Sequence, residues 1–221
     1  MKDEAAREET DRSVSALIES GLAELEINAS SEQVFKLTRL VTLLSDWASR
    51  ISLTGHRDPM ELAGRLVLDA AALSHCLPEL DEASSLADLG SGVGFPGLPI
   101  AILRPHLRVY LVESRLKRNH LQRELRRQLN LPGVVPILGR SDEVEVRASD
   151  VVVAQAMTQP YEALALMKAW VRPGGTVALP ASESAVKPDL PTGMGELSLR
   201  EYIVPTTGRS RKVWIARVLE S

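Results

Sequence analysis

Hydrophobic residues recur at helical spacing through the first third of the chain. In residues 13–28 they form one stripe, as expected for a helix that packs on one side; its members are Val14, Leu17, Ile18, Leu22 and Leu25. A second helix is predicted over residues 30–50, where either serine at its start can act as the cap. Asp58 before Pro59 pairs a capping residue with a first-turn proline, which predicts a third helix ending near Cys76.

The pattern changes near residue 84, where short β-branched runs begin to alternate with helical segments. The predicted strands are 85–89, 108–113, 133–138, 150–155, 175–180, 197–204 and 212–219. The predicted helices among them are 96–103, 115–129 and 159–171. This alternation indicates a parallel sheet covered by helices on both faces. The last two strands have no helix between them, and the spacer Pro205-Thr-Thr-Gly208 predicts an antiparallel hairpin.

Residues 1–12 carry five acidic and three basic side chains, and we expect a flexible arm there. The predicted organisation is this arm, a helical extension over 13–78 and a main domain over 79–221. The chain has 221 residues, 44% of them hydrophobic, and a net charge of −3, which fits a soluble globular protein. Its single cysteine excludes a disulfide framework and a cysteine-rich zinc site.

Two further expectations follow from the same composition. The sequence has no apolar run near the roughly 20 residues that a bilayer span needs, and its polar N-terminus differs from a signal peptide. We therefore expect a cytoplasmic protein that contacts no membrane, and as a separate expectation a monomer. The four histidines show no metal-ligand spacing, so no metal is expected.

A glycine-rich turn follows the first predicted strand, in the segment Asp88-Leu-Gly-Ser-Gly-Val-Gly-Phe-Pro-Gly97. Glycine permits a positive φ and lets a ligand approach the backbone. The N–H groups that open the next helix favour a carboxylate or a phosphate. Residues 92–97 also fit the G-x-G-x-x-G pattern of dinucleotide-binding folds. Glu113 ends the second strand, where both cofactor classes place an acid for ribose hydroxyls.

Three features favour S-adenosylmethionine over a dinucleotide. Asp88 lies two residues before the first glycine, where a carboxylate suits an amino-acid ammonium better than a pyrophosphate. The chain has one such half-domain, whereas a dinucleotide needs two, and it has no second domain for hydride chemistry. We therefore predict an α/β, Rossmann-like methyltransferase fold, with a mostly parallel seven-stranded sheet, a C-terminal antiparallel hairpin and an N-terminal helical extension. An NAD-linked oxidoreductase is the distant alternative.

Residues 88–99, DLGSGVGFPGLP, closely resemble the signature of the RsmG (GidB) family, bacterial enzymes that methylate N7 of a guanosine in 16S ribosomal RNA. Further segments match in order and spacing, namely Trp47-Ala-Ser-Arg-Ile-Ser-Leu-Thr54, Arg65-Leu-Val-Leu-Asp69, Leu111-Val-Glu-Ser-Arg-Leu-Lys-Arg118, Gly139-Arg140 and Arg211. The resemblance covers roughly residues 35–218. It implies an S-adenosylmethionine-dependent methyltransferase whose partner is 16S rRNA or the small ribosomal subunit.

The turn and the resemblance together give the candidate site residues. The cofactor candidates are Asp88, Gly90, Gly92, Gly94 and Phe95 in the turn, Glu113 at the ribose, Ser141 and Asp142 beside the adenine, and Gln155 after the fourth strand. The RNA-binding candidates are Arg65, Arg115, Lys117, Arg118, Arg209 and Arg211. Asp69 and Gln155 are the candidates for a catalytic role.

Several positions depart from the family pattern. Where the family has R-H-x-x-D-S, this chain has Leu66 and Ala70 in place of the histidine and the serine. Gln155 stands where the family has an arginine, and Pro180 begins the dipeptide that replaces Lys-Gly. A neutral glutamine lacks the charge and the fork geometry of a guanidinium. Two alternatives therefore stay open, a methyltransferase with another substrate and a non-catalytic relative that binds the cofactor.

Methyl transfer from a sulfonium depends mainly on proximity and alignment. Guanine N7 has a free lone pair and needs no strong general base, and the sequence shows no convincing one. Cys76, the only candidate nucleophile for transfer to a base carbon, is interpreted as a packed helix residue. The segment Thr158-Gln-Pro-Tyr161 loosely echoes the motif of amine methyltransferases. We interpret it as a threonine cap before a first-turn proline.

The segment 104–127 holds eight basic residues against two glutamates. One interpretation is contact with RNA phosphates. The other is a solvated helix face on which Arg123 and Arg127 pair with their neighbours. The sequence favours neither.

Overall fold

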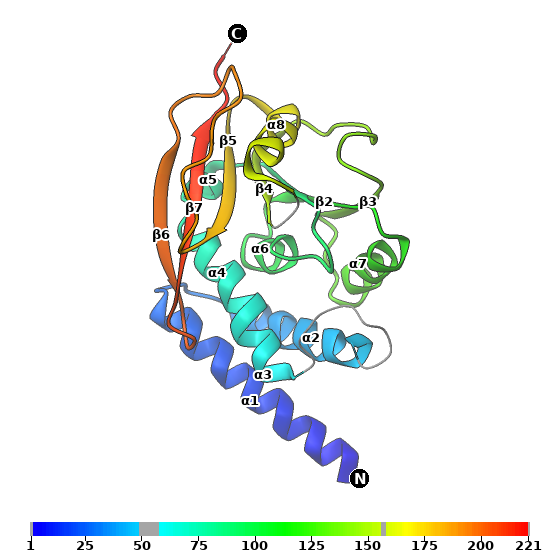
Figure 1. Ribbon diagram of the computed structural model, residues 1–221. Coiled ribbons are helices and arrows are strands. Elements are labelled where there is room, and N and C mark those ends of the chain that lie inside the picture. Colours follow the sequence, from blue (N-terminus) through cyan, green and yellow to red (C-terminus); the bar gives the residue numbers. More distant parts are fainter. Residues whose placement is uncertain (1, 49–57, 156–157, 221) are drawn as a thin grey trace.

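The structure is a computed structural model that describes residues 2–48, 58–155 and 158–220. In this part, seven strands form one sheet with the order β3-β2-β1-β4-β5-β7-β6 (Figure 1). The strands are β1 (Ser85–Leu89), β2 (Arg108–Glu113), β3 (Val134–Leu138), β4 (Ser149–Ala154), β5 (Val171–Ser182), β6 (Ser198–Val204) and β7 (Arg209–Arg217). Strands β1 to β5 are parallel, and β7 runs antiparallel to both β5 and β6. This confirms the predicted parallel sheet with a C-terminal hairpin.

The helices agree with the predicted segments to within a few residues, except that the first helix begins at Lys2 rather than at residue 13. They are α1 (Lys2–Glu24), α2 (Ser31–Ala48), α3 (Pro59–Leu62), α4 (Leu68–His75), α5 (Glu79–Glu82), α6 (Gly97–Leu103), α7 (Leu116–Gln128) and α8 (Pro160–Trp170). A π-helical turn, η1 (Ala63–Val67), joins α3 to α4 within the third predicted helix. The short α5 was not predicted. Most of the motif segment 47–54 and the end of the second predicted helix, 49–50, lie outside the described residues.

Residues 2–12 are helical and belong to α1, so this segment is not disordered, and the flexibility of the predicted arm stays a prediction. The reason for the helix is side-chain pairing that composition does not reveal. Arg12 lies 3.6 Å from Glu8 one turn away, which stabilises a helix. Arg7 donates a 2.7 Å hydrogen bond to Asp46 of α2, which ties the segment to the next helix.

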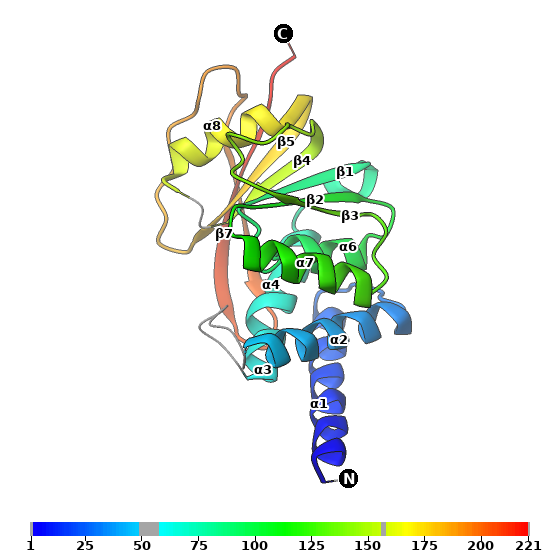
Figure 2. The ribbon, with the colours of Figure 1, turned by 90° about the vertical axis from the view of Figure 1, so that its right-hand side faces the viewer.

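The two faces of the sheet pack against different helices, because successive residues of a strand point to opposite sides. In β1, Leu86 belongs to the hydrophobic cluster beneath α6, whereas Ala87 and Leu89 belong to the cluster beneath α8. Figure 2 shows α8 on one side of the twisted sheet and α4, α6 and α7 on the other.

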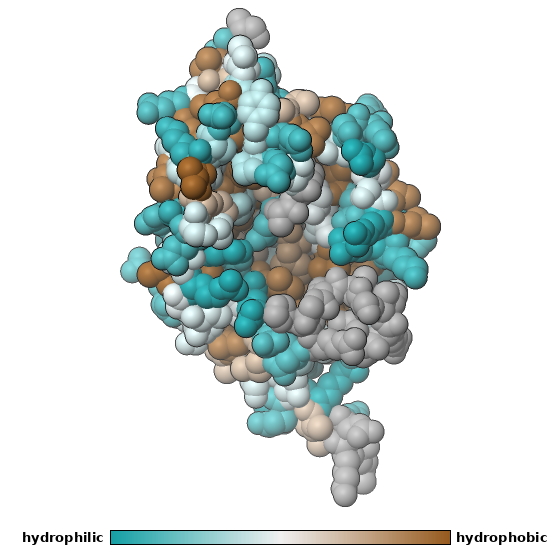
Figure 3. Space-filling model, in the orientation of Figure 1, coloured by the Kyte–Doolittle hydropathy of each residue, from teal (hydrophilic) through white to brown (hydrophobic). Residues whose placement is uncertain are grey.

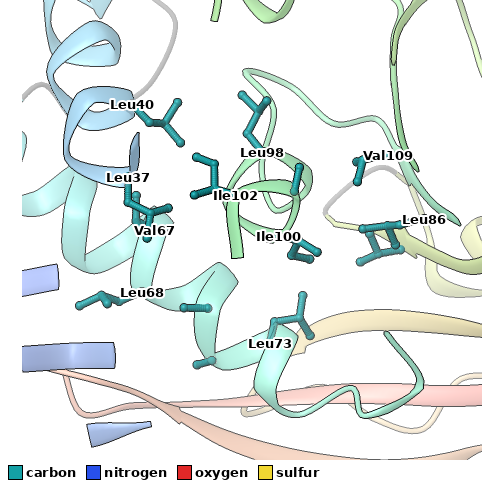
Figure 4. Close-up of a cluster of buried hydrophobic side chains, with 14 of the residues drawn as sticks. Leu37, Leu40, Val67, Leu68, Leu73, Leu86, Leu98, Ile100, Ile102 and Val109 are labelled. Atoms are coloured by element: carbon teal, nitrogen blue, oxygen red, sulfur yellow. The ribbon is translucent and has the colours of Figure 1, made fainter. Parts of the chain in front are cut away.

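The larger cluster extends from the sheet through α6 into the N-terminal helices. In Figure 4, Leu37 and Leu40 of α2 lie near Ile102 of α6, while Leu86 and Val109 come from the sheet. Helices α1 and α2 therefore form an outer layer on the same core. The predicted division between residues 78 and 79 stays a prediction. The larger cluster contains residues from both sides of this boundary.

This architecture brings the candidate chemistry to one edge. The carboxyl ends of β1, β2 and β4 meet there, and they carry the glycine-rich turn, Glu113 and Gln155. In open α/β sheets this edge is where ligands bind. No helix in the described part is long and apolar enough to cross a membrane.

Replacement of a buried leucine in α2 tests whether the N-terminal layer belongs to the main core. Leu37 is fully buried, so Leu37→Ala is expected to lower the free energy of unfolding by about 2–5 kcal/mol. Phe35, two residues away, is 67% exposed, and Phe35→Ala should change it by less than about 0.5 kcal/mol. Urea unfolding at a single pH measures both values. Equal effects of the two variants would contradict the packing described here.

Candidate functional site

The glycine-rich turn combines open and tightly packed positions. Gly90, Gly92 and Gly94 all have positive φ values, of 69°, 58° and 105°. A Cβ added at Gly92 would meet no heavy atom within 4 Å, so the backbone there is open to a ligand. A Cβ at Gly94 would lie only 2.3 Å from Leu98. Gly94 is therefore required by the turn itself, and Gly92 leaves room beside it.

Asp88 holds the turn onto the helix that follows. Its side chain is completely buried, and its Oδ2 accepts a 2.8 Å hydrogen bond from the backbone N–H of Gly97. A Cβ at Gly97 would approach this oxygen to 2.9 Å and Leu111 to 2.3 Å, so only glycine permits the close packing. Asp88 thus lies behind the turn and bonds to its backbone. The sequence analysis had instead suggested a ligand ammonium as the partner of this carboxylate.

Burial dominates the electrostatics of Asp88. It raises the pKa of this carboxyl to about 7; the Gly97 hydrogen bond opposes the shift and the nearby charge of Glu113 adds to it. The Oδ1 atom has no hydrogen-bond partner among the described residues. This carboxyl therefore titrates near neutral pH.

Gln122 of α7 is a second anchor of the turn, which the sequence did not reveal. It is fully buried, and its side-chain Nε2 donates to the Ser91 hydroxyl and to the Gly92 carbonyl, both at 2.8 Å. Its position on the inward face of an amphipathic helix was the one available signal. The turn is thus fixed from both sides, by Asp88 and by Gln122.

Glu113 ends β2 with a fixed carboxylate. Its side chain is 5% exposed. Its Oε1 accepts a 2.7 Å hydrogen bond from the backbone N–H of Arg115. The guanidinium of Arg118, a predicted RNA contact, lies 3.7 Å from the other oxygen. Arg118 therefore faces the candidate ribose acid.

A cavity of about 590 Å³ opens beside the turn, on the α8 side of the sheet. Its size lies within the range of small-molecule sites. Among the predicted cofactor residues, Gly90, Ser141 and Asp142 line it. Arg140 lowers the pKa of Asp142 by a hydrogen bond and its charge. We call this space the large cleft.

Trp170 fixes the segment that carries Ser141. The indole is fully buried, and its Nε1–H donates a 2.8 Å hydrogen bond to the Ser141 carbonyl. A buried tryptophan normally finds such a partner. The predicted adenine contacts therefore rest on a rigid support that sequence reasoning missed.

A second cavity, of about 190 Å³, lies between α4, the turn and the hairpin. It brings together six predicted site residues from distant segments, namely Arg65, Asp69, Phe95, Gln155, Arg209 and Arg211. Leu66 and Ala70, two of the departures from the family pattern, line it as well. We call it the small cavity. The face drawn in Figure 3 is hollowed near its middle, where hydrophobic surface lies deeper than the hydrophilic side chains around it.

A third cavity, of about 340 Å³, connects the other two through shared lining residues. It shares Gln155 and Arg211 with the small cavity and Thr158 with the large cleft. Pro180, the remaining departure, lines this third space. The three cavities therefore form a row along the carboxyl edge of the sheet, with Gln155 at one junction.

Asp69 is the centre of a polar network in the small cavity. Its Oδ2 accepts a 2.7 Å hydrogen bond from Arg211, and its Oδ1 accepts from Arg211 at 3.4 Å and from the Tyr202 hydroxyl at 3.2 Å. Burial opposes the charge of Arg211, yet the hydrogen bond and charge of Asp69 outweigh it and raise the pKa of the guanidinium. Burial, together with the charge of Asp69, also raises the pKa of Tyr202.

The basic segment 104–127 contains both paired and unpaired cations, so each of its two interpretations applies to some of its residues. Arg104 pairs with Asp81, Arg123 bonds to Asn119 and Arg127 pairs with Glu124, so this group behaves as a paired helix surface. Arg115 and Lys117 are exposed and form no ion pair with a described residue. Arg108 and Arg126 of the same segment are likewise exposed without an ion pair to a described residue, so these four cations are available for phosphate contact.

Two smaller predictions have different outcomes. Thr158 is not the cap of α8, because Gln159 occupies that position and the Thr158 hydroxyl donates to Glu162 instead. Pro160 lies in the first turn, as predicted. Cys76 ends α4 half-buried, and burial raises the pKa of its thiol. No cluster of three potential metal ligands exists among the described residues.

Comparisons of sequence find relatives that match most of this chain. The sequence model of a family described as GidB, rRNA small subunit methyltransferase G, matches residues 33–186. A ribosomal RNA small subunit methyltransferase G of Stenotrophomonas maltophilia is 35% identical over 211 residues, covering 89% of this chain and 96% of the relative. The enzyme of the same name from Myxococcus xanthus is 31% identical, covering 88% and 92%.

Solved structures share the fold of this chain. The S-adenosylmethionine-dependent methyltransferase SibL aligns with a TM-score of 0.58 at 15% identity, covering 84% of this chain and 70% of that one. TrmN from Thermus thermophilus aligns with a TM-score of 0.54 at 23% identity, covering 71% and 53%. At these identities the likeness concerns the fold, and it confirms the predicted Rossmann-like methyltransferase architecture.

The buried carboxyl of Asp88 gives a pH-dependent stability. The pKa of Asp88 rises from 3.8 to about 7 on folding, so the folded state binds this proton more tightly than the unfolded state. Its contribution to stability is therefore present at low pH and is lost as pH rises from about 4 to about 7. Asp88→Asn removes the titration and keeps an oxygen for Gly97. The free energy of unfolding of the variant, relative to wild type, should increase across this window and level off above it. Parallel curves for the two proteins would contradict the shift.

Proposed function

Since this chain belongs to the rRNA small subunit methyltransferase G family, we propose that it transfers a methyl group from S-adenosylmethionine to N7 of a guanine in 16S rRNA. The observation that carries the proposal is the row of cavities along one edge of the sheet. It offers a large cleft for a nucleoside cofactor and a smaller, polar space beside it for an acceptor.

The residues present fit S-adenosylmethionine. Gly92 leaves the backbone of the turn open, and Glu113 presents a fixed carboxylate at the end of β2. In the proposal, Glu113 binds the ribose hydroxyls, and Ser141 and Asp142 line the adenine end of the large cleft. When bound, the cofactor supplies an electrophilic methyl group on its sulfonium. Asp88 supports the turn from behind, and its Oδ1 has no hydrogen-bond partner among the described residues.

The small cavity is assigned to the acceptor base. Enzymes that modify a base receive it unstacked in a pocket, and Phe95 of the turn lines this one together with Gln155. Guanine N7 attacks with a lone pair, so the protein needs to orient the base and exclude water rather than remove a proton. Asp69 is paired with Arg211 and is therefore assigned to positioning, not to general base catalysis.

The RNA backbone is assigned to exposed cations near the site, most of which form no ion pair with a described residue. Arg209 and Arg65 line the small cavity, although Arg65 also lies 3.8 Å from Glu61. Arg115 and Lys117 are exposed at the start of α7. The net charge of −3 means that attraction to RNA is local to this face. The intact small subunit as partner, the monomeric state and the cytoplasmic location stay predictions from the sequence.

Transfer of a labelled methyl group tests the function directly. Wild type is expected to label small ribosomal subunits or 16S rRNA from a strain lacking the modification, and the label should be recovered as 7-methylguanosine. Gly92→Arg, which places a long side chain in the open part of the turn, should abolish binding of S-adenosylhomocysteine and labelling together. Cofactor binding by wild type without RNA labelling would instead favour another substrate or a non-catalytic relative.

Removal of one unpaired cation tests the RNA face. Arg209→Gln is expected to reduce the slope of log K against log salt for RNA binding by about one, because one phosphate contact is lost. Arg127→Gln is the matched control, since Arg127 is exposed but paired with Glu124. Fluorescence anisotropy with a 16S rRNA fragment at several salt concentrations measures the slopes. An unchanged slope for Arg209→Gln would remove this residue from the interface.

A further inference from the structure

Tyr202 and Arg211 lie directly opposite each other in the hairpin. Their Cα atoms are register partners in the β6–β7 pair. Asp69 of α4 bonds to both side chains, at 3.2 Å to the tyrosine hydroxyl and 2.7 Å to the guanidinium. The side chains of Asp69 and Arg211 are 13% and 20% exposed, and Tyr202 is 9% exposed. Three partly enclosed polar groups from three elements, α4, β6 and β7, thus form one network.

The network uses only part of the Arg211 guanidinium. An arginine has five N–H donors in a rigid fork, and Asp69 and Tyr202 are its only bonded partners among the described residues. Arg211 also lines both the small cavity and the third cavity. Its remaining donors are therefore held at the junction of two cavities, where a ligand oxygen can accept them.

Tyr202 decides how firmly that fork is held. Asp69 alone could pair with Arg211 in several orientations, since a carboxylate offers about four acceptor positions. The tyrosine hydroxyl occupies one position on Oδ1 and so restricts the rotation of the carboxylate. Hydrogen bonds in such an enclosed place are strong and orient one another. The Tyr202 hydroxyl thus fixes the orientation of Arg211 through Asp69 and need not contact the ligand itself.

We propose that Tyr202 is a positioning residue that acts through Asp69 to hold the free donors of Arg211 against a ligand oxygen beside the transferred methyl group. This inference rests on the proposed function of the site. The oxygen belongs either to the carboxylate of the cofactor or to the carbonyl of the acceptor base. A two-pronged contact of Arg211 with O6 and N7 of guanine is excluded in a reactive complex, because it would occupy the attacking lone pair.

The positioning itself is tested without any substrate. The Nε–H resonance of Arg211, assigned by its loss in Arg211→Lys, should be sharp and slow to exchange in wild type. Tyr202→Phe keeps the ring and removes the hydroxyl, and it should broaden this resonance and speed its exchange. Tyr110→Phe is the matched control, because Tyr110 is a half-buried tyrosine in β2 outside the site. An unchanged resonance in Tyr202→Phe would overturn the proposal.

Ligand measurements then identify the oxygen. If it is the cofactor carboxylate, Tyr202→Phe and Arg211→Lys should raise the Kd of S-adenosylhomocysteine roughly five- to tenfold. Methylthioadenosine, which lacks the carboxylate, should bind unchanged. If it is the base carbonyl, both Kd values should stay constant and kcat/KM for 16S rRNA should fall by a similar factor, with a Tm decrease of at most about 4 °C. Normal values of all three quantities would overturn the proposal.

These readouts keep the two proposals separate. Absence of RNA methylation by wild type would reject the proposed function. The Arg211 resonance and the two Kd values would still decide the role of Tyr202. Normal methylation by Tyr202→Phe, with an unchanged resonance and unchanged Kd values, would reject the role of Tyr202 and leave the proposed function intact.

Discussion

The carboxylate of Asp69 joins parts of the chain that lie far apart in sequence. It comes from α4, and its partners Tyr202 and Arg211 are 133 and 142 residues further along. These contacts close the small cavity between the N-terminal helices and the hairpin. Loss of the carboxylate would leave an enclosed guanidinium unpaired, which is strongly destabilising. The acceptor end of the site therefore depends on an interaction between the helical extension and the last two strands.

The opposite end of the site is stabilised in a different way. The glycine-rich turn is held by neutral or buried groups, through the Asp88–Gly97 bond and the amide of Gln122. Trp170 supports the far wall in the same manner. Such contacts are short and insensitive to salt. Cofactor binding therefore relies on a preformed backbone, whereas the acceptor side relies on charged pairs that orient side chains.

The sequence revealed the features that repeat locally. The hydrophobic periods and the turn signals predicted the mostly parallel sheet, the hairpin and the glycine-rich turn. The motif at residues 88–99 indicated the family. The sequence did not reveal which polar groups pair across the fold. Arg118 and Arg211 looked like free cations, yet they face Glu113 and Asp69. Tyr202 was missed for the same reason, since its role depends on a strand register and a helix distant in sequence.

Three of the departures from the family pattern lie together in the structure. Leu66, Ala70 and Gln155 all line the small cavity. Leu66 and Ala70 are apolar and Gln155 is neutral, so the charged groups of the wall are Asp69, Arg65, Arg209 and Arg211. A lone-pair nucleophile such as N7 must not be engaged by a strong donor before it attacks. In the proposed arrangement, Arg211 is paired with Asp69 and its remaining donors face a ligand oxygen rather than N7, and a neutral Gln155 adds no competing charge. The substitutions are therefore compatible with methyl transfer to N7, since they remove groups that this chemistry does not require.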